Sequence, residues 1–370
     1  MGTSLLITHH SKLGTLPSFR TPHSAFSWED YRFQLSNEIK VASNRRLEVH
    51  AFMITKLSRP THITNELFIR SPHNPIITHK DMPYLCSTVF NPGATEFEGE
   101  TLLLLRVEDL EGKSHLTVAR SRNGVDGWRI ETEPLISPSN GAGPYEVFGC
   151  EDPRITYLDD LNKWVIAYTA YSPFGAGVAL ATTEDFRSVN RFGLVLAPIN
   201  KDAAVFPRKI KDHYWMLHRP AAGDIEHIWL TVSDDLVHWG RPWCVLMERG
   251  GPMWDGSKVG ANTVPIETEE GWLILFHGVK VFAGSPTYRV GLALLDLEDP
   301  RRLIARLPYW ALGPYEPYEV AGAVPNVVFP CGHIQNGDEI RVYYGAADST
   351  VCLATASISE ILDALRKYRV

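Results

Sequence analysis

Two kinds of short apolar segment alternate between about residues 85 and 356. The first kind is a continuous hydrophobic run that ends in charged or polar residues, as in LLLLRVED from Leu102. The second kind mixes apolar and small polar positions and runs into a turn, as in VALATTEDF from Val178. Short apolar runs and period-two alternation, bounded by turn residues, are typical of β-strands. We therefore predict an all-β fold.

The pair of segments recurs five times along the chain. Markers in the second segment of each copy are spaced by 62, 51, 61 and 61 residues, namely Ala119, Ala181, Val232, Ala293 and Ala354. Each copy begins with one more apolar segment and a turn, so each copy would hold three or four strands. Five such copies predict a five-bladed β-propeller. The alternative is a β-sandwich whose strands are alike by chance. The turns recur at matching positions of the copies, which favours the propeller.

Both ends of the chain depart from the repeat. Residues 1–65 are predicted to be a partly helical N-terminal extension, which leaves 66–370 for the propeller. Residues 27–46 fit a helix, and their many apolar positions favour packing on a second subunit, hence a homo-oligomer. Covering one end of the propeller channel and packing on its own propeller are the alternatives. Residues 357–368 (SISEILDALRKY) predict a short amphipathic C-terminal helix.

The composition excludes several classes of protein. Hydrophobic residues make up 44% and charged residues 21%, which is typical of a globular chain. A formal net charge of −7 argues against general nucleic-acid binding. No apolar run approaches the roughly 20 residues of a membrane helix, and we expect no signal peptide. The five cysteines are scattered without a CxxC pair, so we expect reduced thiols, no metal site and a cytoplasmic location.

Polar residues recur where the innermost strand of each predicted blade begins and where the next strand ends. In a propeller these positions converge on one mouth of the central channel. Several of them are cations, and Arg and Lys are the usual partners of phosphate, so the pattern predicts an anionic ligand. Salt bridges between blades are the alternative interpretation. The converging candidates are Asn91, Arg106, Glu151, Asp152, Arg154, Lys201, Arg208, His218, Arg219, Lys258, Asn262, His277, Asn326 and Asp348.

Several segments match the motifs of a known family, both in their residues and in their order along the chain. They include FNPGA (90–94), LLLRVED (103–109), GCEDPRI (149–155), NKDAAVFPRKI (200–210), LHRP (217–220), SKVGANTVPIETEEGWLILFHGV (257–279), YRVGLALLDLEDP (288–300), PNVVFP (325–330) and VYYGAAD (342–348). The chain resembles glycoside hydrolase family 130, five-bladed propellers that are mostly inverting mannoside phosphorylases, with some β-mannosidases. The resemblance spans about residues 68–365.

The resemblance implies roles for individual residues. It makes Asp152 the general acid and assigns mannose binding to Asn91 and Arg106, with Asp348 as a late aspartate of the same site. It implies a phosphate cluster of Lys201, Arg219, Lys258 and Tyr288. We add His218 and Asn326 from the converging set as substrate-binding candidates. The chain departs from the family pattern at two places. Some phosphorylases carry Arg at the position of Lys201, and many members of the family have a KIGAG-type motif in place of residues 258–262.

The chemistry of the candidates favours a phosphorylase. An inverting hydrolase needs a second carboxylate to activate water, whereas phosphate arrives as an anionic nucleophile and needs cations instead. We therefore predict that an oligosaccharide or mannobiose-type β-mannoside reacts with inorganic phosphate to give α-mannose 1-phosphate and a shortened acceptor. Phosphate would be a co-substrate, and no cofactor is expected. One alternative is an inverting β-mannosidase that uses Glu151, Asp202 or Asp348 as base; another is a non-catalytic glycan-binding propeller with platforms at Trp164, Trp272 and Tyr288.

Overall fold

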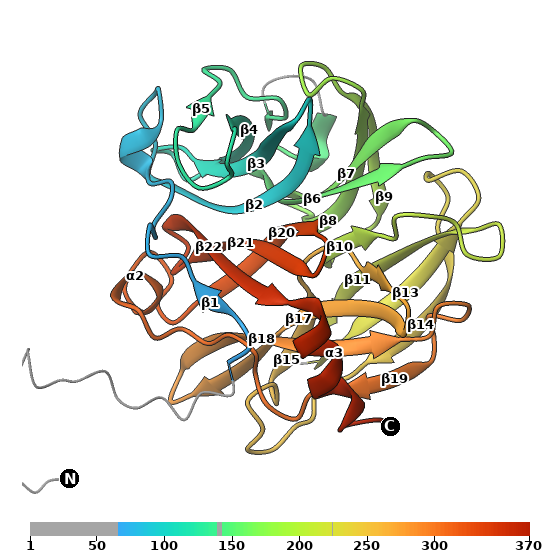
Figure 1. Ribbon diagram of the computed structural model, residues 1–370. Helices are drawn as coiled ribbons and strands as arrows, with labels where there is room; N and C mark the ends of the chain where they lie inside the picture. Colours follow the sequence, from blue (N-terminus) through green and yellow to red (C-terminus); the bar gives the residue numbers. More distant parts are fainter. Residues whose placement is uncertain (1–65, 139–142, 224) are drawn as a thin grey trace, which may run out of the picture. The chain divides into compact units, whose positions relative to one another are not determined.

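The computed structural model describes residues 66–138, 143–223 and 225–370 (Figure 1). The predicted extension over 1–65, with its helix over 27–46, lies outside these residues. Within them the predicted all-β architecture is confirmed. Only short helices interrupt the strands of the described part: the α-helices α2 (Pro317–Val320) and α3 (Ile358–Arg366) and the 3₁₀ helices η1 (His79–Asp81) and η3 (Gly143–Tyr145). None of the helices that the structure describes has the length and apolarity needed to cross a membrane.

Apart from β1, the strands follow one another in five antiparallel groups, which we call groups 1 to 5 and which make up four sheets. Group 1 holds β2 (Thr88–Phe97), β3 (Glu100–Glu108), β4 (Ser114–Ser121) and β5 (Arg129–Ile130). Group 2 holds β6 (Gly149–Leu158), β7 (Lys163–Ser172), β8 (Gly175–Thr183) and β9 (Asn190–Leu196). A single parallel pairing, between Ser114 and Gly149, joins groups 1 and 2 into one eight-stranded sheet.

Groups 3 and 4 are separate sheets of five strands each. Group 3 holds β10 (Asn200–Val205), β11 (Tyr214–Ala222), β12 (Ile225–Glu226), β13 (Ile228–Ser233) and β14 (Gly240–Leu246). Group 4 holds β15 (Lys258–Ala261), β16 (Ile266–Thr268), β17 (Gly271–Phe282), β18 (Ser285–Leu295) and β19 (Leu303–Arg306).

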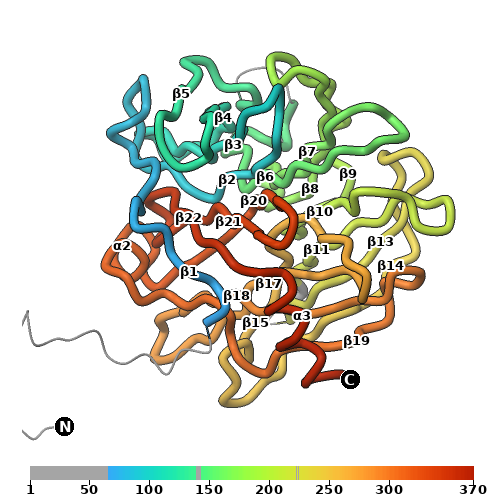
Figure 2. The backbone as a smooth tube through the Cα atoms, viewed as in Figure 1, coloured from blue at the N-terminus to red at the C-terminus, as the bar shows by residue number. Residues whose placement is uncertain are grey.

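Group 5 combines strands from the two ends of the described chain. It holds β1 (Ile69–Arg70), β20 (Val328–Asn336), β21 (Glu339–Ala346) and β22 (Thr350–Ser357). The early strand β1 pairs antiparallel with β22, with Ile69 opposite Thr355 (Figure 2). This pairing ties the beginning of the described chain to its last sheet.

The core consists of clusters that each lie between two strand groups. Alternate residues of one strand belong to different clusters: Leu102 and Leu104 of β3 pack with group 2, while Leu103 and Leu105 pack with group 5. Side chains alternate faces along a strand, so a strand buried on both faces needs a continuous apolar run. Five of these clusters contain, in turn, Leu104 with Ile166, Val165 with Met216, Leu217 with Ile274, Leu275 with Val342, and Tyr343 with Leu103.

The predicted C-terminal helix is confirmed as α3. Ser357 is its N-cap, and the Ser357 hydroxyl accepts a hydrogen bond from the Glu360 amide. The predicted apolar face of Ile361, Leu362 and Leu365 is buried against the cluster of groups 4 and 5. Burial of this face stabilises a helix too short to persist alone in water.

The start of the described chain offers a test of how group 5 is held. Phe68 is 3% exposed within the cluster of groups 4 and 5, whereas its neighbour Ile69 is 73% exposed. We expect Phe68→Ala to lower the free energy of unfolding by about 3–5 kcal/mol, because it leaves a cavity. Ile69→Ala should change it by less than about 0.5 kcal/mol. Urea unfolding of both variants measures this, and equal losses would contradict the packing described.

Candidate active site

Three polar residues occupy the same kind of irregularity in the first strands of groups 1, 2 and 3. In each strand the pairing register shifts, between Phe90 and Gly93 in β2 and at the matching places in β6 and β10. Asn91, Asp152 and Asp202 sit in these bulges with φ of 42°, 50° and 56°. Asn and Asp enter this left-handed region more readily than most other residues. A bulge re-aims its side chain, here away from the regular ladder.

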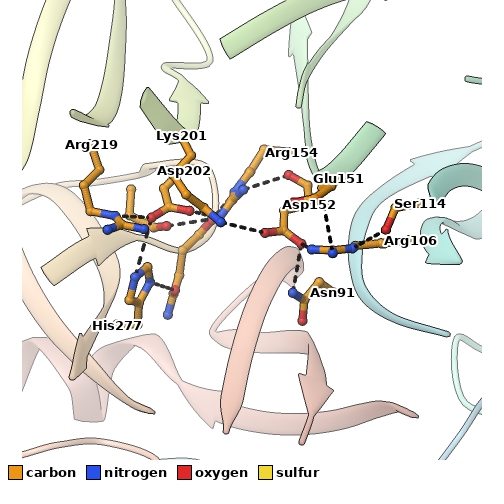
Figure 3. Close-up of polar contacts among 12 residues, drawn as sticks. Asn91, Arg106, Ser114, Glu151, Asp152, Arg154, Lys201, Asp202, Arg219 and His277 are labelled. Atoms are coloured by element: carbon orange, nitrogen blue, oxygen red, sulfur yellow. Dashed lines mark hydrogen bonds and ion pairs between the residues drawn. The ribbon is translucent and has the colours of Figure 1, made fainter. Parts of the chain in front are cut away.

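The polar residues of the site form two connected halves, and Asp152 is the centre of the first (Figure 3). Its carboxyl oxygen Oδ1 accepts hydrogen bonds from Asn91 Nδ2 at 2.9 Å and from Arg106 Nη1 at 2.8 Å. Its other oxygen, Oδ2, lies 3.8 Å from Lys201 Nζ. Arg106 also reaches Glu151 at 3.1 Å, and Ser114 accepts from its Nε at 3.0 Å. The contacts bring residues of groups 1, 2 and 3 onto one carboxylate.

The surroundings of Asp152 keep it ionised. Burial by itself would raise the pKa of this carboxyl. The charges of Arg106, Lys201 and Arg154 and the hydrogen bond from Asn91 outweigh burial and lower the pKa to about 2. Opposite charges within a few ångströms favour the charged form in this way.

Asn91 itself depends on a glycine of group 5. A Cβ atom at Gly345 of β21 would collide with the side-chain oxygen Oδ1 of Asn91 and crowd the backbone nitrogen of Asn91. The VYYGAAD segment therefore needs glycine at this position so that the backbone can approach Asn91.

The second half of the site centres on Asp202, which is fully buried. Its Oδ2 accepts from Arg219 Nε at 2.6 Å, and it lies 3.5 Å from His277 Nε2. Burial would raise the pKa of Asp202, but the charges of Arg219 and Lys201 help to hold it far below its ordinary range. Asp202 therefore acts as a fixed anion that orients Arg219.

Arg154 bridges the two halves through the main chain. Its Nη1 donates to the Asp152 carbonyl at 2.7 Å, and its Nε donates to the Asn262 carbonyl at 2.8 Å. The guanidinium is 1% exposed and lies 3.8 Å from Asp202. It thereby locks β6 of group 2 to the end of β15 of group 4.

His277 is neutral, because burial holds its pKa well below the ordinary value. Its Nδ1 lies 2.8 Å from the Asn262 side chain, while its Nε2 faces the carboxylate of Asp202. The tautomer that carries its proton on Nε2 directs it toward Asp202 and leaves Nδ1 as an acceptor. Turning the Asn262 amide by half a turn then lets its nitrogen donate to Nδ1. This arrangement gives partners to two buried atoms, Asn262 Nδ2 and His277 Nε2, that otherwise have none in the described structure.

Lys258 and Tyr288 of group 4 adjoin Arg219 through a carboxylate from β12. Glu226 forms an ion pair with Arg219 Nη1, and its Oε1 lies 4.0 Å from Lys258 Nζ. The Lys258 ammonium also lies over the Tyr288 ring, 5.3 Å from its centroid. The structure thus brings three members of the predicted phosphate cluster to one region, and Lys201 links that region to Asp152.

Asp348 follows β21 in a left-handed conformation, with φ of 49°. Burial raises its pKa to about 6, although the Arg106 charge acts in the opposite direction. Asp152 and Glu151 also act on Asp348 electrostatically, so it belongs to the same region as predicted.

Two substrate-binding candidates lie less directly at this network. His218 Nδ1 pairs with Asn200 Oδ1 at 3.1 Å, and burial lowers the pKa of His218 to about 4. Asn326 has a φ of 63°, and its carbonyl accepts a hydrogen bond from the Tyr288 amide at 2.9 Å. Asn326 is therefore close to the phosphate cluster, while the His218 side chain pairs with Asn200 of β10.

The sequence interpretation missed Glu226 and considered Asp202 only as a base. Glu226 stands seven positions after Arg219, and only the β11–β12 hairpin returns it to that side chain. Asp202 follows Lys201 in the same bulge pattern as Asn91 and Asp152, a signal that could have found it. Trp272 is completely buried in the core, so it is no stacking platform for a glycan.

Two buried oxygens of the site lack a hydrogen-bond partner in the described structure: Asn91 Oδ1 and Asp202 Oδ1. Unpaired buried polar atoms are costly, so each of these oxygens is suited to a buried water molecule. Among the described residues, no group of three or more His, Cys, Asp or Glu side chains is arranged to hold a metal ion.

Comparison with known proteins agrees with the motifs. A family model for glycoside hydrolase family 130, described as β-1,4-mannooligosaccharide phosphorylase, matches residues 56–367. The chain belongs to glycoside hydrolase family 130. The resemblance inferred from the segments between residues 68 and 365 is thereby confirmed.

Relatives in family 130 match most of the chain. A β-1,2-mannobiose phosphorylase of Listeria innocua is 35% identical over 356 residues, which covers 80% of this chain and 98% of the relative. A β-1,4-mannooligosaccharide phosphorylase of Ruminococcus albus is 30% identical over 311 residues, covering 80% and 90%. The solved complex of the L. innocua enzyme with β-1,2-mannobiose matches with a TM-score of 0.74 at 34% identity, covering 82% of this family-130 chain and 100% of that chain.

The raised pKa of Asp348 predicts a pH-dependent effect on stability. Its folded pKa of about 6 exceeds the value of about 3.9 for an unfolded aspartate. Between these values the folded state binds more protons, so the free energy of unfolding falls as the pH rises. Asp348→Asn removes this titration, and we expect its unfolding temperature, relative to that of the wild type, to be higher at pH 7 than at pH 4.

Thermal unfolding at the two pH values measures the effect. Asp159→Asn, which removes an exposed aspartate, controls for the loss of one negative charge. A difference between Asp348→Asn and wild type that stays constant from pH 4 to pH 7 would count against a raised pKa.

Proposed function

We propose that this family-130 chain is an inverting phosphorylase that cleaves a β-mannoside with inorganic phosphate. The observation that supports this proposal most is the position of the buried acid Asp152 beside a row of cations. The row consists of Lys201, Arg219 and Lys258. Such a set suits the oxygens of phosphate, because charge-assisted hydrogen bonds from Arg and Lys are the strong ones. The names of the family-130 relatives support the same reaction.

In the proposed reaction a phosphate oxygen attacks C1 of the mannosyl residue from the side opposite the leaving group. The bond from C1 to the glycosidic oxygen breaks, and that oxygen takes a proton and leaves as the acceptor hydroxyl. The products are α-mannose 1-phosphate and an acceptor shortened by one mannose. Asp152 supplies the proton, through a mannosyl hydroxyl as the family resemblance implies, and Asn91 and Arg106 hold the mannose beside it.

The low pKa of Asp152 assigns phosphate a second role in this proposal. With a pKa of about 2, Asp152 carries no proton at neutral pH in the phosphate-free protein. Phosphate brings negative charge to Lys201, one of the cations that lower this pKa. A nearby anion raises the pKa of a carboxyl, so bound phosphate would help Asp152 to become protonated and act as the acid.

We propose that the five strand groups are the five blades of a closed propeller. Two observations support this arrangement. Five apolar clusters of the described residues join groups 1 and 2, 2 and 3, 3 and 4, 4 and 5, and finally 5 and 1. In addition, one cavity of about 500 Å³ is lined by strands of groups 1, 2, 4 and 5, through Thr95, Thr156, Ile266 and His333, and by Pro207, which follows β10 of group 3. A ring of blades around an axial channel accounts for both.

The higher identity to the β-1,2-mannobiose phosphorylase favours a β-1,2-linked substrate for this chain. The proposed reaction takes phosphate as co-substrate and requires no cofactor. All five cysteines are free thiols, which supports the proposal of a reducing, cytoplasmic location. Assembly into a homo-oligomer through residues 27–46 stays a prediction.

Dependence on phosphate is the direct test of the reaction. We expect α-mannose 1-phosphate to form from β-1,2-mannobiose only when phosphate is present, with less product from β-1,4-mannobiose. Sodium sulfate at equal ionic strength serves as the control for a salt effect. Free mannose released at the same rate without phosphate would reject the phosphorylase and favour the β-mannosidase alternative.

Asp152→Asn tests the acid. The amide keeps the shape of the side chain but cannot donate the proton, and general acid catalysis typically contributes about 10²–10⁴-fold. We expect a kcat loss of that order on mannobiose. A nitrophenyl β-mannoside should lose less, because its leaving group needs little protonation. Turnover of mannobiose close to that of the wild type would require a different acid.

A further inference from the structure

Glu226 places a second carboxylate on cations that the phosphate site needs. It pairs with Arg219, which already forms a 2.6 Å hydrogen bond to Asp202, and it lies 4.0 Å from Lys258. The side chains of Arg219, Lys258 and Glu226 are 5%, 24% and 22% exposed, whereas that of Asp202 is fully buried. Arg219 therefore has two carboxylate partners: Asp202, which is buried, and Glu226, which is partly exposed to solvent.

The two carboxylates differ in how firmly the backbone holds them. Asp202 lies in the bulge of β10, between pairings of Lys201 and Ala204 with β11. Glu226 lies on β12, which is two residues long and pairs with β11 only through Ala221 and Ala222. A carboxylate on such a short hairpin strand can leave its partners at a smaller cost than one fixed in a buried ladder.

A count of charges shows why Glu226 and phosphate cannot easily be bound to Lys201, Arg219 and Lys258 at the same time. Lys201, Arg219 and Lys258 supply three positive charges, and Asp202 and Glu226 supply two negative ones. Arg154 adds one positive charge 3.8 Å from Asp202. A phosphate dianion that arrived beside Glu226 would therefore cancel all the positive charge of the cluster and place two negative charges against the Glu226 carboxylate. Like charges in a partly desolvated site repel each other strongly. Phosphate binding therefore favours the departure of Glu226.

We propose that Glu226 is an internal counter-ion that occupies the phosphate subsite, and that inorganic phosphate binds by displacing it. This inference rests on the proposed phosphorylase function and names the residue that sets its phosphate affinity. The carboxylate and phosphate are interchangeable here because both offer anionic oxygens to the same Arg and Lys donors. Before phosphate arrives, Glu226 keeps Arg219 and Lys258 oriented and compensated.

Glu226→Gln is the decisive variant, because it keeps the size and hydrogen-bonding capacity of the side chain and removes its charge. We expect the KM for phosphate to fall by about fivefold, the effect of one partly exposed ion pair. The kcat and the KM for mannobiose should change little. Calorimetric titration with inorganic phosphate, in the absence of sugar, should give the same gain in affinity without any dependence on turnover.

Glu248→Gln is the matched control. Glu248 has the same 22% side-chain exposure, and it pairs with His227, the next residue after Glu226, instead of the phosphate cations. Its replacement removes one negative charge from the same part of group 3. We expect its phosphate affinity to match the wild type, so a gain in both variants would indicate a general charge effect and overturn the proposal.

The remaining outcomes separate this inference from the proposed function. If the wild type uses phosphate but Glu226→Gln binds it with equal or lower affinity, Glu226 is a structural brace for Arg219, and the inference is wrong. If the wild type neither binds nor consumes phosphate, the proposed function itself fails. Loss of phosphate-independent mannose release in Glu226→Gln would instead make Glu226 the base of a hydrolase, against both proposals.

Discussion

The site depends on the need to pair buried charges. Cations and carboxylates alternate from Arg106 through Asp152 to Lys201, and Arg219 continues the series through Asp202 (Figure 3). A buried charge without a partner is very costly, and removing one member of a buried pair typically costs about 3–5 kcal/mol. Each charge therefore fixes the position of its neighbours. Because the members come from groups 1, 2 and 3, the network also fixes these groups relative to one another.

The backbone is adapted to this network at the bulges. Asn91, Asp152 and Asp202 each adopt a left-handed conformation that the regular strand would not allow. Strain of this kind persists where the surroundings determine the conformation, and it is common at functional sites. The flanking strands supply that support, since they resume regular pairing on both sides of each bulge. These three residues of the site are thus held by paired strands and not by loops.

The two halves of the site have different electrostatic tasks. Around Asp152 the cations exceed what one carboxylate requires, and the result is an acid that is ionised in the absence of ligand. Around Arg219 two carboxylates share the cations, one buried at Asp202 and one partly exposed at Glu226. In the proposed function an anionic ligand affects both halves, because it competes with Glu226 and at the same time reduces the positive field on Asp152. In the proposed reaction, Lys201 couples anion binding to proton donation by Asp152.

The sequence by itself determined the strands, the five-fold repeat of segments, the C-terminal helix and most of the residues that come together in the candidate site. These features depend on local patterns: alternation, turn residues, and motifs such as EDPR around Asp152. The tertiary structure decided what depends on register and burial. It placed Glu226 on Arg219 through a short hairpin, buried Trp272 in the core, and joined His218 to Asn200. It also set opposite pKa shifts on Asp152 and Asp348, because the balance of burial and nearby charge exists only after distant strands have met.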